Sequence, residues 1–89
     1  MDRSLLVKKY EIFEEGMSYE VIQFFCDYKN VTYELGDSLL FIGSNYVPYD
    51  SGLSLFFEKD GSEIQIMLRI DSHFQEEIAL NLEDYFRAL

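Results

Sequence analysis

Residues 53–70 read LSLFFEKDGSEIQIMLRI, and this stretch decides the class of fold. Apolar residues alternate with other residues on both sides of Asp60-Gly61. The members of this apolar face are Leu53, Leu55 and Phe57 before the turn, and Ile64, Ile66, Leu68 and Ile70 after it. Asp-Gly accepts the positive φ angles that a tight hairpin needs. The stretch therefore predicts an antiparallel hairpin with strands over residues 53–58 and 63–70.

Two further strands are expected upstream. Val31, Tyr33 and Leu35 alternate with polar residues, which is the period of a strand with one buried face. Residues 38–42 form a continuous run that indicates a central strand covered on both faces. A connection over residues 43–52 then leads into the hairpin. Together these segments predict a four-stranded antiparallel meander.

Helices are predicted on either side of the sheet. Leu5, Leu6, Tyr10 and Phe13 recur at near-helical spacing, and Gly16 follows as a stop signal. A second helix is expected over residues 19–29, with Ser18 as its N-cap. The density of aromatic and β-branched residues there makes a strand the alternative.

The last predicted element is a helix that begins after Asp71 or Ser72 and runs to the end of the chain. It carries one apolar stripe, made of Phe74, Ile78, Leu82, Tyr85, Phe86 and Leu89. Glu83 and Arg87 are spaced to form an i, i+4 ion pair. The predicted order is ααββββα, an α+β fold in a single domain over residues 1–89.

Composition constrains the kind of partner. The chain has 17 acidic and seven basic residues, a net charge of -10, yet 17% of its residues are aromatic. Acidic disordered chains are poor in aromatic residues, so this chain is expected to fold and to present a negative field. Such a field repels nucleic acid and anionic membranes and attracts basic proteins.

The sequence offers little for catalysis. His73 is the single histidine and Cys26 the single cysteine, and Cys26 lies in an apolar segment where a structural thiol is expected. Neither a zinc-type cluster nor a glycine-rich phosphate loop occurs in the sequence. We therefore expect a protein that is not an enzyme and that uses neither a cofactor nor a metal.

Recognition is what remains, and two groups of residues are candidates for binding a protein partner. The first is Tyr46, Tyr49 and Asp50, in the connection over residues 43–52, where tyrosines can anchor an interface. The second is an acidic and aromatic group around the start of the sheet, comprising Asp27, Tyr28, Tyr33, Glu34 and Asp37. The alternative is that the tyrosines of the first group cover the edge of the core and that the second group is an ordinary solvated surface.

These features predict a small acidic inhibitor or immunity-type protein, bacterial or phage in origin, that neutralises a basic protein target such as a toxin or a nucleic-acid-binding enzyme. One alternative is a phage-type nucleic-acid mimic, and another is a housekeeping module that dimerises or binds a small ligand. A homodimer is compatible with each. Because there is one cysteine and neither a signal peptide nor a membrane span is apparent, a cytoplasmic location is expected.

Overall fold

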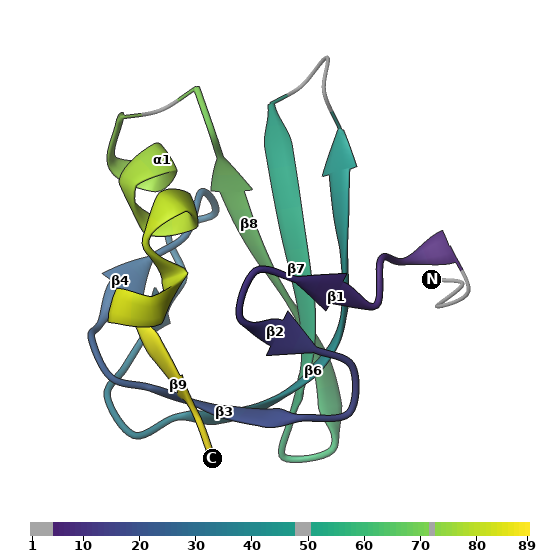
Figure 1. The fold of residues 1–89 in the computed structure, drawn as a ribbon. Helices are drawn as coiled ribbons and strands as arrows, with labels where there is room; N and C mark the ends of the chain where they lie inside the picture. Colours follow the sequence, from purple (N-terminus) through teal and green to yellow (C-terminus); the bar gives the residue numbers. More distant parts are fainter. Residues whose placement is uncertain (1–4, 48–50, 72) are drawn as a thin grey trace.

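In the residues that the structure describes, the protein is built mainly from antiparallel strands, with one short α-helix (Figure 1). A computed structural model describes residues 5–47, 51–71 and 73–89, excluding the side chains of His73 and Phe74. The strands are β1 (Lys9–Tyr10), β2 (Phe13–Glu14), β3 (Ser18–Val21), β4 (Phe25–Cys26), β5 (Thr32–Tyr33), β6 (Ser38–Val47), β7 (Gly52–Lys59), β8 (Ser62–Arg69) and β9 (Phe86–Ala88). The helix α1 (His73–Leu80) and the 3₁₀ turn η3 (Leu82–Asp84) lie between β8 and β9.

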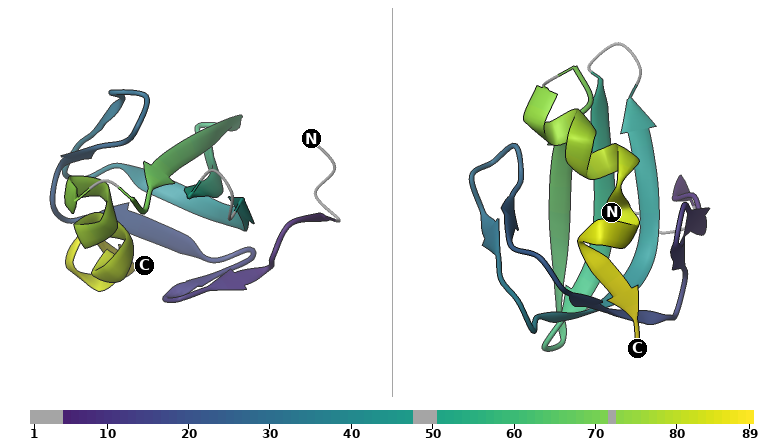
Figure 2. Two further views of the ribbon diagram at one scale, coloured as in Figure 1. Left: turned by 90° about the horizontal axis from the view of Figure 1, so that it is seen from above. Right: turned by 60° about the vertical axis from the view of Figure 1, so that its left-hand side comes forward.

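The main sheet has five strands in the order β8-β7-β6-β3-β9, and β1-β2 and β4-β5 form two small hairpins beside it. The predicted hairpin around Asp60-Gly61 is confirmed, because β7 and β8 pair in register across it and both turn residues have positive φ. Strand β6 extends to Val47, through most of the segment that the sequence indicated as a loop. Figure 2 shows β6, β7 and β8 side by side, with α1 lying across them.

The two predicted N-terminal helices are wrong, and with them the ααββββα order and the balanced α+β class. Residues 9–14 form the β1-β2 hairpin, whose turn residue Glu11 has a φ of 51°. Within the second predicted helix, Tyr19 and Val21 are buried while Ser18 and Glu20 are partly exposed, which is the period of a strand. A short segment rich in aromatic residues can form a helix or a strand. Here the strand is favoured, because β3 forms backbone hydrogen bonds with β6.

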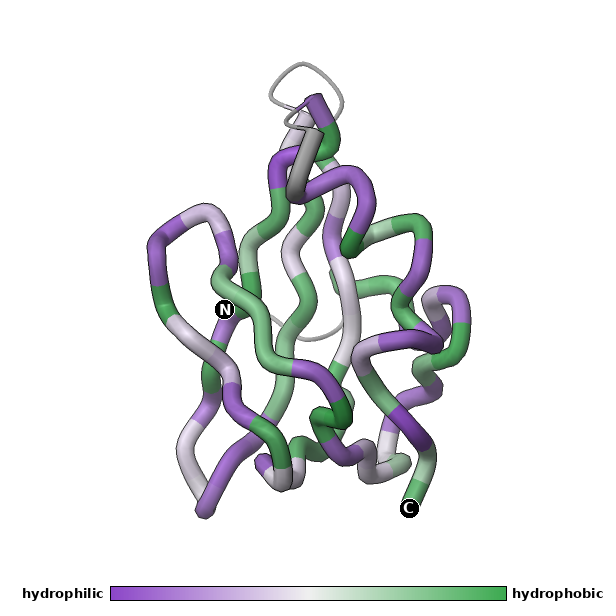
Figure 3. Tube along the Cα trace, turned by 90° about the vertical axis from the view of Figure 1, so that its left-hand side faces the viewer, coloured by the Kyte–Doolittle hydropathy of each residue, from purple (hydrophilic) through white to green (hydrophobic). Residues whose placement is uncertain are grey.

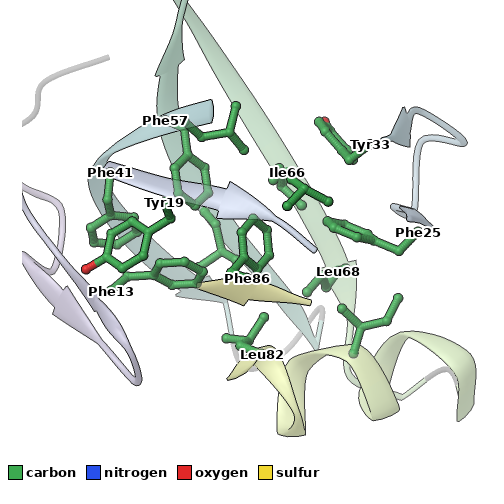
Figure 4. Packing of buried hydrophobic residues seen from close by; sticks show 14 of the residues in the cluster. Phe13, Tyr19, Phe25, Tyr33, Phe41, Phe57, Ile66, Leu68, Leu82 and Phe86 are labelled. Atoms are coloured by element: carbon green, nitrogen blue, oxygen red, sulfur yellow. The ribbon is translucent and has the colours of Figure 1, made fainter. Parts of the chain in front are cut away.

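Aromatic packing explains why the β1-β2 hairpin stays on the sheet. The Phe13 side chain is fully buried, and its ring lies 4.9–5.3 Å from four others, namely Tyr19, Phe41, Phe57 and Phe86. Figure 4 shows these rings meeting between the hairpin, the sheet and the C-terminal strand. Apart from the stacked pair with Phe41, these contacts are edge-on, an arrangement favoured by the charge distribution of aromatic rings. Phe13 therefore joins β2 to four other strands, namely β3, β6, β7 and β9.

The C-terminal helix is shorter than predicted. It ends at Leu80, a 3₁₀ turn follows, and residues 86–88 leave the helical path to pair with β3. Phe86 is buried as a strand residue, whereas Leu89, the last residue of the predicted apolar stripe, is 61% exposed. Arg87 bonds Glu20 on β3 rather than the predicted Glu83, with a nitrogen–oxygen distance of 2.6 Å.

The outer face of the sheet is covered by the N-terminal segment. Leu6 is buried against Ile42 and Phe56, and Val7 exchanges two backbone hydrogen bonds of 2.9 Å with Ser44. A Cβ atom on Gly43 would lie 2.7 Å from the Leu6 Cβ, so this close crossing requires glycine. An extra residue in β6 opposite β7, between Phe41 and Gly43, lets Phe41 point into the main core.

Candidate functional site

The first predicted group of binding residues is only partly described. Tyr46 lies on β6 with 47% of its surface exposed, while Tyr49 and Asp50 lie outside the described residues. Tyr46 lies close to Tyr10: burial first, then the charges of Glu11 and of Tyr46, raise the pKa of Tyr10. Tyr46 is thus available to a partner, beside a second tyrosine from β1.

The second predicted group is brought together by the β4-β5 hairpin, but two of its members lie inside the protein. Asp27 is 2% exposed, and its carboxylate accepts hydrogen bonds from the backbone N–H groups of Lys29, Val31 and Met67 at 2.9–3.1 Å. Tyr33 is buried against Phe25, with ring centroids 5.2 Å apart. Burial, followed by the charge of Asp27 and a hydrogen bond to it, raises the pKa of Tyr33 to about 12. These two residues dock the hairpin onto the sheet.

The other three members of this group are on the surface. Tyr28 is 52% exposed and lies under the Arg69 guanidinium, whose central carbon is 5.1 Å from the ring centroid. Asp37 pairs with Lys59 at 3.4 Å and also accepts the backbone N–H of Glu34. Glu34 itself is exposed. Of this group, Tyr28 and Glu34 present the most surface to a partner.

Most described basic side chains are already engaged. Ion pairs join Lys8 to Glu15, Lys9 to Glu14, Lys59 to Asp37, Arg69 to Asp71 and Arg87 to Glu20. Lys29 donates to the Gln65 side chain at 3.3 Å. A hydrogen bond from Arg69, reinforced by its charge, lowers the pKa of Asp71. Positive charge is therefore largely neutralised across the described surface.

Four carboxylates lie close together in the sequence on α1 and η3. In the part of the chain that the structure describes, Glu76, Glu77, Glu83 and Asp84 make no ion pair with a basic side chain. Glu76, Glu77, Glu83 and Asp84 are all exposed. They give this end of the molecule an uncompensated negative surface.

A cleft of about 380 Å³ opens on this acidic surface, and we refer to it as the α1–η3 cleft. Its lining residues are Gln23, Glu77, Asn81, Asp84 and Tyr85. Carboxylates accept hydrogen bonds, as do the amide and phenol oxygens beside them. The lining contains no cation, so its chemistry suits an ammonium or guanidinium group.

Local structure explains how the cleft is assembled. The helix ends at Leu80, and the Asn81 side chain donates to the Glu77 carbonyl at 2.8 Å, one turn earlier. Buried Leu82 anchors the 3₁₀ turn to the core, which leaves Asp84 and Tyr85 at the cleft. The backbone N–H of Ile22 donates to the Tyr85 carbonyl at 2.8 Å and so keeps the following residue, Gln23, at the opposite wall.

The pKa of the Tyr85 hydroxyl reflects the negative charge around the cleft. Partial burial is the main cause that raises the pKa of this hydroxyl, and the charges of Glu77 and then Asp84 raise it further. Both carboxylates thus act on the same small volume. Tyr85 remains protonated and able to donate a hydrogen bond at neutral pH.

Glu77, Asn81, Asp84 and Tyr85 were not among the predicted binding residues. For Glu77, Asn81 and Asp84, the signal that would have found them is their spacing of i, i+4 and i+7, a polar stripe next to the apolar one, whereas Tyr85 was assigned to the apolar stripe itself. Gln23 carries no such signal, because its position depends on the pairing of β3 with β9.

Other sites are weaker candidates. A shallow depression of about 330 Å³ on the outer face of β7 and β8 is lined by Phe56, Glu63, Ile64 and Gln65. Within residues 5–47, 51–71 and 73–89, no three His, Cys, Asp or Glu side chains are placed to hold a metal ion together. Cys26, expected to be a buried structural thiol, is exposed on β4. None of the helices in the described ranges is long and apolar enough to cross a membrane.

The fold and the cleft define a small antiparallel β-sheet protein with an acidic surface at its one helix. The chain belongs to the family described as domain of unknown function DUF3601, whose model matches residues 2–89. It is similar to an integron cassette protein of known structure from the mobile metagenome of Vibrio cholerae, with 52% sequence identity and a TM-score of 0.97. That similarity covers 100% of this chain and 99% of the other. None of the curated proteins matches the chain.

Proposed function

We propose that the protein binds a basic protein partner through the acidic surface of α1 and η3, and that it neutralises this partner in the manner of an inhibitor or immunity protein. The observation that carries this proposal is the charge distribution. The cations on the described surface are engaged by neighbouring groups, while Glu76, Glu77, Glu83 and Asp84 have no basic partner. A toxin and a nucleic-acid-binding enzyme are cationic proteins of the required kind.

The α1–η3 cleft gives the interaction a specific contact as well as a general attraction. A lysine or arginine side chain of the partner enters between Glu77 and Asp84, where Tyr85 and Asn81 supply further polar groups. Hydrogen bonds to charged groups contribute about 1.5–3 kcal/mol each when they replace contacts with water. The surrounding carboxylates raise the association rate, an effect that salt weakens.

The β4-β5 hairpin extends the proposed surface. It lies beside α1, since the Gln75 side chain donates to the Cys26 carbonyl at 3.2 Å, and the two elements are adjacent in Figure 2. Tyr28 and Glu34 on this hairpin add an aromatic contact and another carboxylate. Tyr46 lies on β6, which β7 separates from β8 in the sheet (Figure 1), and we propose it only as a secondary contact. Action in the cytoplasm fits a chain with one cysteine, because disulfides are rare there.

The test is capture of proteins from a bacterial lysate on the immobilised protein, followed by elution with rising salt. The expected result is a cationic protein that is retained at about 50 mM salt and released by about 500 mM. Changing Glu77→Gln together with Asp84→Asn is expected to weaken retention by about tenfold or more. The matched control, Glu76→Gln with Glu83→Gln, removes the same charge from the same elements but outside the cleft lining.

Two results would count against the proposal. If no basic protein is retained by the unaltered protein, its acidic surface does not serve recognition of such a partner. If the cleft variant and the control variant lose retention equally, the cleft itself makes no specific contact and the attraction is one of net charge alone.

A further inference from the structure

The two edge strands of the five-stranded sheet, β8 and β9, differ in whether their outward backbone groups are hydrogen-bonded. On β8, several of these groups have partners. Met67 donates its N–H to the Asp27 carboxylate at 3.1 Å, and its carbonyl accepts the N–H of Tyr28 at 2.7 Å. Farther along, the Gln65 carbonyl accepts the Tyr33 hydroxyl at 3.4 Å, and the Arg69 N–H donates to the Gln75 side chain at 3.3 Å. These contacts engage both backbone groups of Met67, the carbonyl of Gln65 and the N–H of Arg69, which would otherwise be available to another strand.

The β9 edge lacks such cover. Ile22 N–H donates to the Tyr85 carbonyl at 2.8 Å, and Leu89 N–H donates to the Ser18 carbonyl at 3.0 Å. Because hydrogen-bonded pairs alternate along an antiparallel ladder, the backbone groups of Phe86 and Ala88 face away from β3. No described residue supplies them with a hydrogen-bond partner. Phe86 as a whole residue is only 2% exposed, whereas Ala88 is exposed, so the accessible part of this edge is the backbone of Ala88. The C-terminal end of this strand lies at the margin of the molecule in Figure 3.

The charge around this edge indicates what could occupy it. Glu83 and Asp84 directly precede β9 and have no basic partner among the described residues, whereas Arg87 is held by Glu20. A second copy of the chain would bring a second pair of unneutralised carboxylates to the same edge. An extended segment with cationic side chains instead complements them.

We infer that an extended segment of the basic partner adds to the sheet alongside β9 as a sixth strand. This inference rests on the proposed function and specifies the form in which the partner is recognised. Antiparallel addition continues the pattern of this sheet, in which all paired strands are antiparallel. Backbone bonds to Ala88 would hold the segment, while its lysine or arginine side chains reach the acids that precede β9.

The experiment uses two synthetic peptides that alternate lysine and threonine. They are identical except that one is N-methylated at alternate residues, which keeps the charge but removes the backbone donors needed for pairing. Binding is followed by amide NMR and by hydrogen exchange of the intact protein. The unmethylated peptide is expected to bind about tenfold more tightly than the methylated one and to protect the amide of Ala88.

Two variants give the controls. Ala88→Pro removes an outward N–H that β3 does not use, and proline is tolerated at such a position on an edge strand. It is expected to abolish the difference between the two peptides, whereas Ala88→Ser keeps the N–H and the difference. The NMR spectrum of each variant without peptide shows whether its fold is retained.

The outcomes separate this inference from the proposed function. Equal binding of both peptides, without protection of the Ala88 amide, overturns strand addition and leaves recognition by the acidic surface standing. Failure of both peptides to bind overturns strand addition. The proposed function is overturned by a different result, namely that no basic protein is captured from the lysate. A dimer in light scattering that Ala88→Pro disrupts would place a second copy at the edge and also overturn the inference.

Discussion

Replacement of Asp27 is the sharpest test of how the small β4-β5 hairpin is attached. The buried carboxylate holds three backbone N–H groups, of Lys29 and Val31 through one oxygen and of Met67 through the other. Asp27→Ala leaves all three donors without this acceptor. Each unsatisfied buried group costs about 1–3 kcal/mol. The N–H groups of Lys29 and Val31 cost less than that of Met67, because water can reach these exposed turn residues more easily. We therefore expect a loss of about 3–5 kcal/mol in the free energy of unfolding.

Asp27→Asn gives a finer measurement of the same contact. Its one oxygen can still accept from Lys29 and Val31, but its NH₂ group then faces the Met67 N–H, donor against donor. The expected loss is about 2 kcal/mol. Urea denaturation gives the free energy, and hydrogen exchange of the Met67 and Tyr28 amides reports local detachment of the hairpin.

The control is Asp60→Asn, which removes the same charge at an exposed turn position with a positive φ that asparagine tolerates. We expect it to change the unfolding free energy by less than about 0.5 kcal/mol. An Asp27→Asn protein as stable as the control, with unchanged exchange at Met67, would refute the view that this carboxylate fastens the hairpin to β8.

Three further predictions concern the core and its pH dependence. Burial and Asp27 raise the pKa of Tyr33 from its ordinary value of 10.0 to about 12, so folding favours the protonated hydroxyl and stability is expected to fall as pH rises from 10 to 12. In pH-dependent denaturation, Tyr33→Phe should flatten this fall, and an unchanged profile would contradict the assignment. Gly43→Ala would place a methyl group against Leu6 and is expected to cost about 1–3 kcal/mol in thermal unfolding, while a neutral effect would mean that the N-terminal segment moves freely aside. Phe13→Ala should cost about 3–5 kcal/mol in urea denaturation, and a loss below about 1 kcal/mol would show that the aromatic cluster does not hold the β1-β2 hairpin.

The elements that could be predicted are those whose signals are local. The β7-β8 hairpin is specified by strict alternation and an Asp-Gly turn, and its buried residues Leu55 and Ile66 face the core as expected. The N-terminal third could not be predicted in the same way. Its apolar residues are spaced closely enough to suit a helix or short strands, and the choice depended on β6 and β9, which lie far away in the sequence.

The binding surface shows the same division. Acidity and the value of exposed tyrosines were readable from composition, and Tyr28 and Tyr46 are indeed exposed. Asp27 and Tyr33 have the same residue types as their exposed counterparts, but the docking of β4-β5 against β8 places them inside. A sequence pattern does not distinguish a carboxylate that meets solvent from one that meets backbone N–H groups of another strand.

By itself, the sequence determined that the chain carries a large negative charge, that it has enough aromatic surface to fold, and that a hairpin forms around Asp60-Gly61. Only the tertiary structure decided that the chain leaves its last helix at Leu80 and pairs Phe86–Ala88 with β3. The physical reason is that local patterns describe which face of a segment is apolar, whereas strand pairing depends on backbone partners contributed from elsewhere. The same long-range pairing opens the α1–η3 cleft and leaves the β9 edge without a neighbour.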